Sequence, residues 1–413
     1  IRSTTNPTVH VAHGSGPYVN TRRALVGVGL SPVRGKRVLL KPNVGRVAAP
    51  GSGIVTHPEV VAAAIDGFRE AGAEVAVGES PIVGVEMQEA FSVSGTAAVA
   101  APRHCPLIDM DRRRFVPVPV PDGLVIQALK VCPEVLEFDF LVSVPVMKMH
   151  MHTGVSLSVK NMKGCLWRRS KVEFHMLPPV AGSRHKPIDL AIADMASVLR
   201  PHLAIVDGTV GMEGLGPSAG QPKPLDAVVV SADAFAADAV ACQLMGTAAG
   251  RVPHLSIGAE RGHGGIDLSR LSVAPNHWRD WVSPFAHPPE NLTIEFPNIT
   301  VHDQQSCSAC QSTLLLFLTR YKDRIFDYFP GQTTVQIAIG KGCGDLPPGA
   351  LRARLHALPA QARERALNWL RGFGFPAADA DLLRVDDDGG VFYADDAPAP
   401  APGADAADTP VAQ

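Results

Sequence analysis

Lysine, asparagine and glutamate side chains stand at the ends of short apolar segments of this sequence. Lys41 and Asn43 lie at the end of the apolar segment 37–41, and Glu79 follows the segment 74–78. Such groups can bind an anion, because an ammonium supplies charge and an amide supplies both a donor and an acceptor. Open α/β sheets bind ligands at the carboxyl ends of their strands. We therefore expect these three side chains to share one substrate-binding site.

A second concentration of such groups lies in the segment 148–164, which reads KMHMHTGVSLSVKNMKG. Basic and amide side chains around a glycine turn can bind an anion, although a solvated basic loop has the same composition. General acid–base catalysis would require pKa values near neutrality. We predict that the catalytic residues are Lys148, His150 and Lys160, and that further substrate contacts come from Asn161 and Lys163. His150 and His152 alternate, so on a strand they would share a face and could bind a metal ion.

Acidic side chains follow in the glycine-rich segment 207–220, which we expect to be a loop whose backbone approaches a ligand closely. Asp207 and Glu213 are substrate-binding candidates that could hold Mg²⁺ bridged to a phosphate or carboxylate. Asp233 is most simply a helix N-cap. Asp238 lies inside an apolar helical segment, where a buried carboxylate needs a partner. It faces either the lysines or solvent.

Three cysteines in the last third of the chain have a spacing that suits metal binding. Cys307 and Cys310 form a CxxC at the expected start of a helix, and Cys343 follows in a glycine-rich turn. Helix-terminal amides stabilise thiolates, and three cysteines suit an iron–sulfur cluster, such as [4Fe–4S], with one open or different ligand. Zinc with His302, a metal-free redox CxxC and reduced core cysteines are the alternatives. Cys165 is a candidate fourth ligand or a substrate-facing thiol.

The alternation of strand and helix signals positions these groups on an α/β fold. Apolar runs of strand length alternate with helical periodicity through the first 250 residues, which predicts a mostly parallel sheet with flanking helices. Expected strands are 37–41, 74–78, 138–145, 203–207 and 227–230, and expected helices begin near 56, 189 and 233. We assign 1–255 to this domain, 256–395 to a smaller cysteine-bearing α/β domain, and 396–413 to a disordered tail.

Composition excludes some classes of protein. The 413 residues include 38 Lys and Arg against 40 Asp and Glu, a net charge of −2 that gives no reason to expect nucleic-acid binding. No apolar run approaches the length of a membrane span. Seven cysteines, an odd number, argue against a disulfide framework and favour a reducing, cytoplasmic location. The sequence begins at Ile1, so we expect that an upstream segment was removed or left out.

Five segments together resemble the family catalogued as domain of unknown function 362. They begin at Lys41 (KPNVG), Thr56 (THPEVV), Val144 (VPVMKMH), Val206 (VDGTVGMEG) and Ser231 (SADAFAAD), and the resemblance covers residues 35–260. It implies a bacterial or archaeal protein, and many members carry iron–sulfur segments. The family's recurring positions fall on Lys41, Asn43, Glu79, Lys148, His150, Lys160, Asn161, Asp207, Glu213, Gly216 and Asp233. The ferredoxin-like cysteine run of many members is absent here, which favours a cluster with an open iron, or no cluster.

We interpret the chain as an iron–sulfur enzyme that acts on a small anionic metabolite, a carboxylate or a phosphate, by redox or Lewis-acid chemistry. One alternative is a non-catalytic cluster-binding or electron-transfer protein with a redox partner protein. The other is a magnesium-dependent, phosphate-handling enzyme with structural cysteines. Convergence of the cysteines with Lys148 and Lys160 on one cleft would favour the enzyme.

Overall fold

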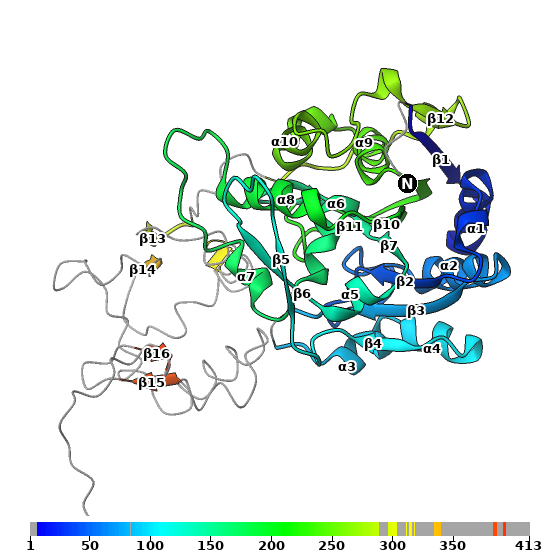
Figure 1. Cartoon of the computed structure of the whole chain (residues 1–413). Coiled ribbons are helices and arrows are strands. Elements are labelled where there is room, and N and C mark those ends of the chain that lie inside the picture. Colours follow the sequence, from blue (N-terminus) through cyan, green and yellow to red (C-terminus); the bar gives the residue numbers. More distant parts are fainter. Residues whose placement is uncertain are drawn as a thin grey trace, which may run out of the picture.

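A ten-stranded mixed sheet forms the centre of the part of the chain that the structure describes (Figure 1). The structure is a computed structural model and describes residues 6–82, 84–288, 296–303, 311, 314–315, 318, 334–339, 383–385 and 391–393. The strand order is β12-β1-β11-β10-β7-β2-β3-β4, with β8 paired to β10 and β9. These strands are β1 (Thr8–His13), β2 (Arg37–Pro42), β3 (Glu74–Glu79), β4 (Leu107–Asp109), β7 (Phe140–Val144), β8 (Val146–His150), β9 (Gly154–Ser156), β10 (Leu203–Glu213), β11 (Gln221–Ser231) and β12 (Ser272–Ala274).

The direction of the strands confirms the predicted mostly parallel α/β sheet. Strands β10, β7, β2, β3 and β4 pair in parallel, whereas β11 runs antiparallel to both β1 and β10. Three two-stranded ladders complete the described strands. They are β5 (Val116–Pro119) with β6 (Ala128–Val131), β13 (Ile299–Asp303) with β14 (Val335–Ile339), and β15 (Leu383–Val385) with β16 (Val391–Tyr393).

Helices cover both faces of the sheet, so that its strands are buried on both sides. One core lies beneath α1 (Pro17–Val28) and α2 (Pro58–Glu70). The other core lies beneath α6 (Ser158–Asn161), α8 (Pro187–Val198) and α9 (Ala234–Leu244). The remaining described α-helices are α3 (Met87–Val93), α4 (Thr96–Ala100), α5 (Pro133–Glu137), α7 (Ser170–Glu173) and α10 (Pro253–Glu260). The 3₁₀ turn η3 (Met162–Cys165) follows α6. No described helix is long and apolar enough to cross a membrane.

Helix α2 illustrates how the local sequence fixes an element. Its apolar side chains recur at helical spacing and are buried, including Val61, Ile65 and Phe68. Pro58 stands in the first turn, where its missing N–H costs nothing. The His57 ring accepts a hydrogen bond from the Glu59 N–H at 3.2 Å and so caps the helix. The helix start expected near residue 56 agrees with these bounds.

The first half of the glycine-rich segment 207–220 is strand rather than the loop that the sequence predicts, and residues 214–220 form the turn between β10 and β11. Strand β10 continues to Glu213 and pairs antiparallel with β11, with an irregularity in register between Gly208 and Val210. Several glycines here are enforced by close packing rather than by a ligand. A Cβ on Gly211 would lie 2.8 Å from the Met147 carbonyl oxygen, for example. The glycines therefore permit strands to cross closely, which a single sequence does not distinguish from a flexible loop.

The α/β body continues past residue 255, where the sequence predicts its end. Strand β12 pairs in parallel with β1 at the edge of the main sheet. Trp278 and Phe285 are buried in the core beneath α9. Most of the predicted second domain and all of the predicted tail lie outside the described residues. Within it, strands β13 and β14 pair in parallel.

Replacing a core side chain of α2 tests this arrangement of faces. Ile65 is completely buried, so Ile65→Ala should lower the free energy of unfolding by about 2–5 kcal/mol through lost transfer energy and the remaining cavity. Val26 on α1 is 78% exposed, so Val26→Ala should change it by about 0.5 kcal/mol or less. Urea unfolding followed by circular dichroism measures both. Equal losses in the two variants would contradict the burial of α2 against the sheet.

Candidate anion-binding site

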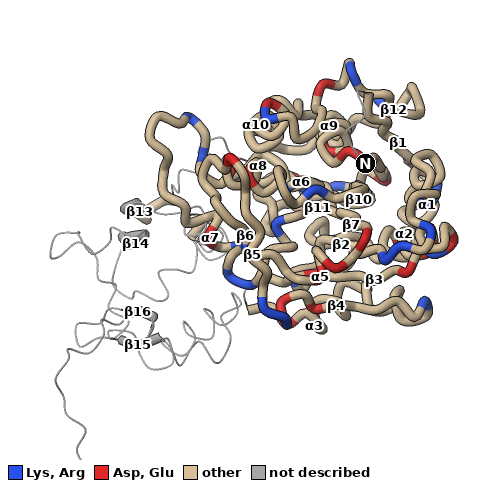
Figure 2. The backbone as a smooth tube through the Cα atoms, viewed as in Figure 1, with Lys and Arg blue, Asp and Glu red and all other residues tan. Residues whose placement is uncertain are grey.

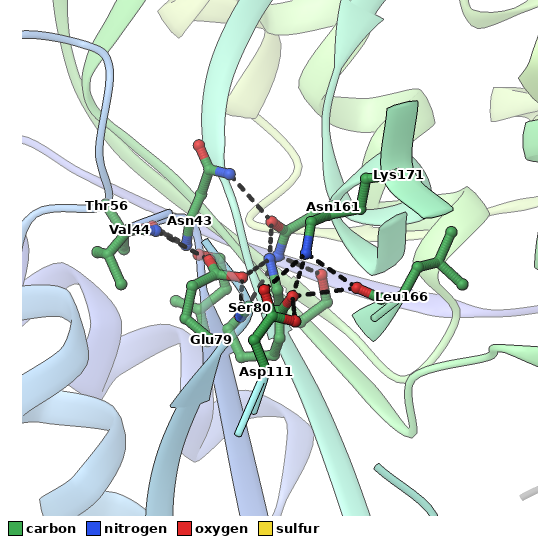
Figure 3. A network of polar contacts seen from close by, with 12 residues as sticks. Asn43, Val44, Thr56, Glu79, Ser80, Asp111, Asn161, Leu166 and Lys171 are labelled. Atoms are coloured by element: carbon green, nitrogen blue, oxygen red, sulfur yellow. Dashed lines mark hydrogen bonds and ion pairs between the residues drawn. The ribbon is translucent and has the colours of Figure 1, made fainter. Parts of the chain in front are cut away.

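A buried ion pair stands at the carboxyl ends of β2 and β3. Lys41 Nζ lies 2.9 Å from Glu79 Oε1, and the two side chains are only 1% and 2% exposed. The N–H groups of Val44 and Ser80 donate to the two Glu79 carboxylate oxygens, each at 3.0 Å (Figure 3). Burial raises the pKa of Glu79, and Lys41 is the largest influence opposing that rise. Lys41 and Glu79 therefore hold strands together rather than offering free charge to a ligand.

The Asn161 amide joins this ion pair to helix α6. Lys41 Nζ donates to Asn161 Oδ1 at 2.9 Å, and the Asn43 amide donates to the same oxygen at 3.3 Å. The Asn161 amide nitrogen donates in turn to the Lys41 carbonyl and to Ser143 Oγ, both at 3.1 Å. Asn161 thus connects β2, β7 and α6, and the carboxyl ends of these strands are fixed to the helix that bears Lys160.

Lys148 lies on β8 beside this network and is 4% exposed. Its ammonium donates to Asn43 Oδ1 at 2.5 Å and to the Ile54 carbonyl at 2.7 Å. Both acceptors are neutral groups. Burial, and then the positive charges of Arg46 and Lys160, lower the pKa of Lys148 well below its ordinary value. An anion placed here would stabilise the protonated amine.

Lys160 and Lys163 extend the same positive region along α6 and η3. Burial lowers the pKa of Lys160 to about 7, opposed by the Asp189 carboxylate and assisted by Arg46. Burial, followed by the charge of Lys160, lowers the pKa of Lys163 well below its ordinary value. Lys163 Nζ and His175 Nε2 are hydrogen-bonded at 2.6 Å. Two lysines whose pKa values are lowered by burial therefore stand within one positive cluster.

The cations of this site form no described ion pair, although the charge of Asp189 favours protonated Lys160 and that of Glu79 favours protonated Lys148. Lys148 and Lys160 are buried, and Arg46 and Lys163 are half-buried. None of the four makes an ion pair with a carboxylate among the residues that the structure describes. By contrast, the buried Lys41 lies 2.9 Å from Glu79, and the buried Lys171 lies 3.6 Å from Asp111. Uncompensated positive charge away from water is unfavourable unless a ligand supplies the counter-charge.

His150 and His152 lie at the end of β8, with ring centroids 6.1 Å apart. His150 Nδ1 accepts the N–H of His152 at 3.1 Å, which fixes the orientation of the ring. Burial and the charge of Lys160 lower the pKa of His150 well below its ordinary value, so the ring is neutral at pH 7. No group of three or more metal-ligating side chains is arranged for a metal ion in the described ranges. The structure therefore gives no support to a histidine metal site.

The two carboxylates of β10 are occupied by backbone donors. Asp207 is buried and accepts the N–H groups of His57 at 2.7 Å and Thr209 at 2.9 Å. Glu213 accepts the N–H of Ala286 at 2.9 Å. Neither carboxylate belongs to a described metal-binding group. The magnesium alternative, which rests on Asp207 and Glu213, gains no support, and Asp207 instead positions the start of α2.

Asp238 caps the helix that bears Lys160. The side chain is fully buried, and its two oxygens accept the N–H groups of Ser158 at 2.7 Å and Val159 at 2.9 Å. Burial raises the pKa of Asp238 to about 8, opposed by these two donors. Both sequence alternatives for Asp238 are wrong, because it faces the amino end of α6 rather than lysines or solvent. Asp233 is the helix N-cap that the sequence predicts, and accepts the N–H of Phe235 at 2.8 Å.

A second polar network lies directly beside Glu79 (Figure 3). Ser80 Oγ contacts Asp111 Oδ1 at 2.5 Å, and Lys171 donates to Ser80 Oγ. Lys171 also donates to the Leu166 carbonyl at 3.0 Å. These contacts fix the segment after η3 to the end of β3. The sequence reasoning missed this network, because its members are widely separated in the chain.

The sequence reasoning missed Arg46, which belongs to the positive cluster, and His175, which contacts Lys163. Arg46 lies three residues after Asn43, so its place just beyond a strand end was an available signal. His175 lies in the segment after α7, which carries no recognisable pattern. Its contact with Lys163 could be found only from the tertiary structure.

The cysteines separate into two groups. The side chains of four predicted metal ligands lie outside the described part of the structure, namely Cys307, Cys310, Cys343 and the alternative ligand His302. The candidate fourth ligand Cys165 lies within it. Burial raises the pKa of the Cys165 thiol to about 12. A thiol that resists ionisation is a poor metal ligand or nucleophile. Cys165 is therefore a buried core thiol, as are Cys105, Cys132 and Cys242.

The fold and site together define a mixed α/β protein with a cluster of lysines on β8, α6 and η3 that form no described ion pair. Over residues 38–243 the chain matches the family described as Domain of unknown function (DUF362). The chain belongs to this family, as the sequence resemblance predicts. The matched span runs from β2 to α9 and contains all the described candidate residues from Lys41 to Glu213.

Two further comparisons describe what the chain is similar to. It is 29% identical to a thylakoid-associated protein of Synechocystis sp. over 266 residues, which is 64% of this chain and 77% of that protein. It is also similar to the structure of the lactate racemase apoprotein from Thermoanaerobacterium thermosaccharolyticum, with 16% identity and a TM-score of 0.40. That similarity covers 58% of this chain and 56% of the other.

A substitution at Gly164 tests how tightly the site is packed. A Cβ at Gly164 would lie 2.3 Å from Lys41 Nζ and 2.6 Å from Glu79 Oε1. Gly164→Ala should therefore displace the ion pair and lower the free energy of unfolding by about 1–3 kcal/mol. Gly250 is the control, because a Cβ there would meet nothing within 4 Å. Thermal and urea unfolding compare the variants, and an unchanged Gly164→Ala protein would disprove the packing described.

Proposed function

We propose that the protein is an enzyme that binds a small metabolite carrying at least two negative charges, as phosphate or carboxylate groups. The observation that carries the proposal is the cluster formed by Arg46, Lys148, Lys160 and Lys163, which has no described carboxylate partner. Ammonium and guanidinium groups bind phosphate and carboxylate through charge-assisted hydrogen bonds. A dianion would restore the charge balance that burial disturbs.

The proposed chemistry is proton transfer at the bound metabolite. A pKa of about 7 lets Lys160 exist in both protonation states near neutral pH, which is what a general acid or base requires. The neutral His150 ring lies on the neighbouring strand β8. Its Nδ1 accepts the His152 N–H, so its proton is on Nε2, which can donate a hydrogen bond to the metabolite. Asn43 and Asn161 orient the lysines through neutral amide groups. The reaction class is therefore one in which a proton leaves or joins a carbon or oxygen beside an anionic group.

An iron–sulfur cluster held by Cys307, Cys310 and Cys343 stays a proposal from the sequence. Such a cluster would supply Lewis-acid or electron-transfer chemistry to the metabolite. A redox partner protein and a cytoplasmic location likewise stay predictions. The buried, poorly ionising cysteines of the α/β body are unsuited to cluster binding, which leaves these three as the candidate ligands.

Anion binding and its pH dependence test the proposed site. Sulfate and oxalate both keep a charge of −2 between pH 6 and 9, and they stand for phosphate and carboxylate ligands. The pKa of Lys160 is about 7 in the free protein, so this amine loses its proton as the pH rises from 7 to 9. Binding should therefore take up protons and weaken about tenfold or more over that range. Calorimetry in buffers of different ionisation enthalpy measures both effects.

Lysine variants provide the matched control for this binding measurement. Lys163→Met should weaken binding of the preferred anion about tenfold, because one charge of the cluster is lost. Lys36→Met removes an exposed lysine just before β2, at the amino end of that strand, and should leave binding unchanged. Equal effects of the two substitutions, or tighter binding at pH 9 than at pH 7, would refute the proposed site.

Metal analysis tests the cluster separately. Protein purified without oxygen should be brown and contain matched iron and acid-labile sulfide, and Cys310→Ser should lose both. Cys242→Ser, in which a buried core thiol is changed, should retain them. Colourless wild-type protein that contains zinc or no metal would exclude the iron–sulfur proposal. Sulfate binding by Cys310→Ser would show whether the anion site depends on the cysteines.

A further inference from the structure

A cavity of about 310 Å³ lies at the opposite end of the sheet from the candidate anion-binding site. Its lining includes Thr8, where β1 begins, Ser231, where β11 ends, and Pro201, two residues before β10. Strands β10, β7 and β2 are parallel, so this is their amino end, whereas the lysine cluster stands toward their carboxyl ends. The lysines of that cluster are not among the residues that line the cavity.

Arg200, in the connection from α8 to β10, supplies the positive charge of this cavity. Its Nε donates to the Ala196 carbonyl at 3.2 Å, and its Nη2 donates to His263 Nδ1 at 3.0 Å. Burial lowers the pKa of His263 to about 4, assisted by Arg200, so the ring is a neutral acceptor. These contacts orient the guanidinium and leave Nη1 unused. Arg200 forms no ion pair with a carboxylate among the residues that the structure describes.

Asp233 also lines the cavity, and its carboxylate is already bound to backbone donors. The N–H groups of Phe235, Ala236 and Gly265 donate to it at 2.8, 3.1 and 3.4 Å. Burial raises the pKa of Asp233, opposed by these donors and by the charge of Arg200. A ligand with one negative charge suits this balance, because a dianion would bring a second charge that no cation of the lining meets.

Apolar side chains make up a large part of the remaining lining. They include Val28 from α1, Val159 from α6, Leu199 just after α8 and Phe235 from α9. His10 lies among them, and burial lowers the pKa of its ring, so it is neutral at pH 7. Ligand pockets of this kind combine an apolar wall with a few polar groups that fix orientation. The lining therefore suits a molecule with a charged head and an apolar body.

We propose that this cavity binds a small monocarboxylate with an apolar body. The carboxylate accepts hydrogen bonds from Nη1 and the remaining N–H of Nη2 of Arg200, because the planar guanidinium matches its two oxygens. The apolar body packs against Leu199 and Phe235 and so leaves water. This site is separate from the proposed function, because it uses other residues at the other end of the sheet.

Titration of fluorinated carboxylates, followed by ¹⁹F NMR on the full chain, tests this site. The probes are 4-fluorobenzoate and 6-fluorohexanoate, which carry the same charge on an aromatic and an aliphatic body. At least one should bind the wild type, and its neutral amide should bind about tenfold more weakly or worse. Arg200→Met should weaken binding about tenfold or more, because charge-assisted hydrogen bonds are lost. Arg251→Met changes an exposed arginine outside the lining and should leave binding unchanged.

Two further variants locate the bound probe. Ala232 is exposed and lines the cavity, so Ala232→Trp should fill part of it and weaken binding about tenfold or more. Lys163→Met changes the lysine cluster and should leave probe binding unchanged. Arg200 is also exposed, so circular dichroism should show folded protein for both cavity variants.

The inference would be overturned if neither probe binds, or if binding is unweakened in folded Arg200→Met or folded Ala232→Trp. Equal weakening by Lys163→Met and Arg200→Met would also overturn it, because the probe would then occupy the lysine cluster. Absence of sulfate and oxalate binding by the wild type would instead refute the proposed function and leave this site standing.

Discussion

The buried ion pair between Lys41 and Glu79 is the interaction on which the rest of the site depends. Removing two charges from water is costly, and the cost is recovered only when both partners and their hydrogen bonds are in place. Here the partners stand on adjacent parallel strands, two backbone N–H groups complete the carboxylate, and Asn161 completes the ammonium. Loss of either partner would leave an uncompensated charge in the core. The pair therefore fixes the spacing of β2 and β3 and the approach of α6.

The site has two parts that differ in how their charges are paired. In the first part, Lys41 and Glu79 neutralise each other, so this pair provides rigidity and no net attraction for a ligand. In the second part, Lys148 on β8, Lys160 on α6 and Lys163 on η3 form no described ion pair. Burial together with mutual repulsion lowers the pKa values of these three lysines. This arrangement favours the binding of anions. It is stable because a lysine in such surroundings can release its proton rather than remain charged.

Helix α6, which bears Lys160, depends on distant parts of the chain for its stability. A helix of four residues cannot form by itself, because its nucleation is unfavourable and it has too few internal hydrogen bonds. Its amino end is capped by Asp238 from α9, and its carboxyl end is held by the amide of Asn161 against β2. The position of Lys160 is therefore set by residues about 80 and 120 positions away in the chain.

The sequence by itself determined the alternating α/β order and the polar strand ends, because apolar periodicity and carboxyl-terminal polar residues are local properties. It placed Lys41, Glu79 and Lys148 at those ends, and the structure brings them together. It misjudged the glycines after Asp207, since close strand crossing and flexible loops use the same residue. Only the tertiary structure decided which charges are paired, because pairing depends on contacts between distant segments. The roles of Asp238 and Arg46 follow from that folding alone.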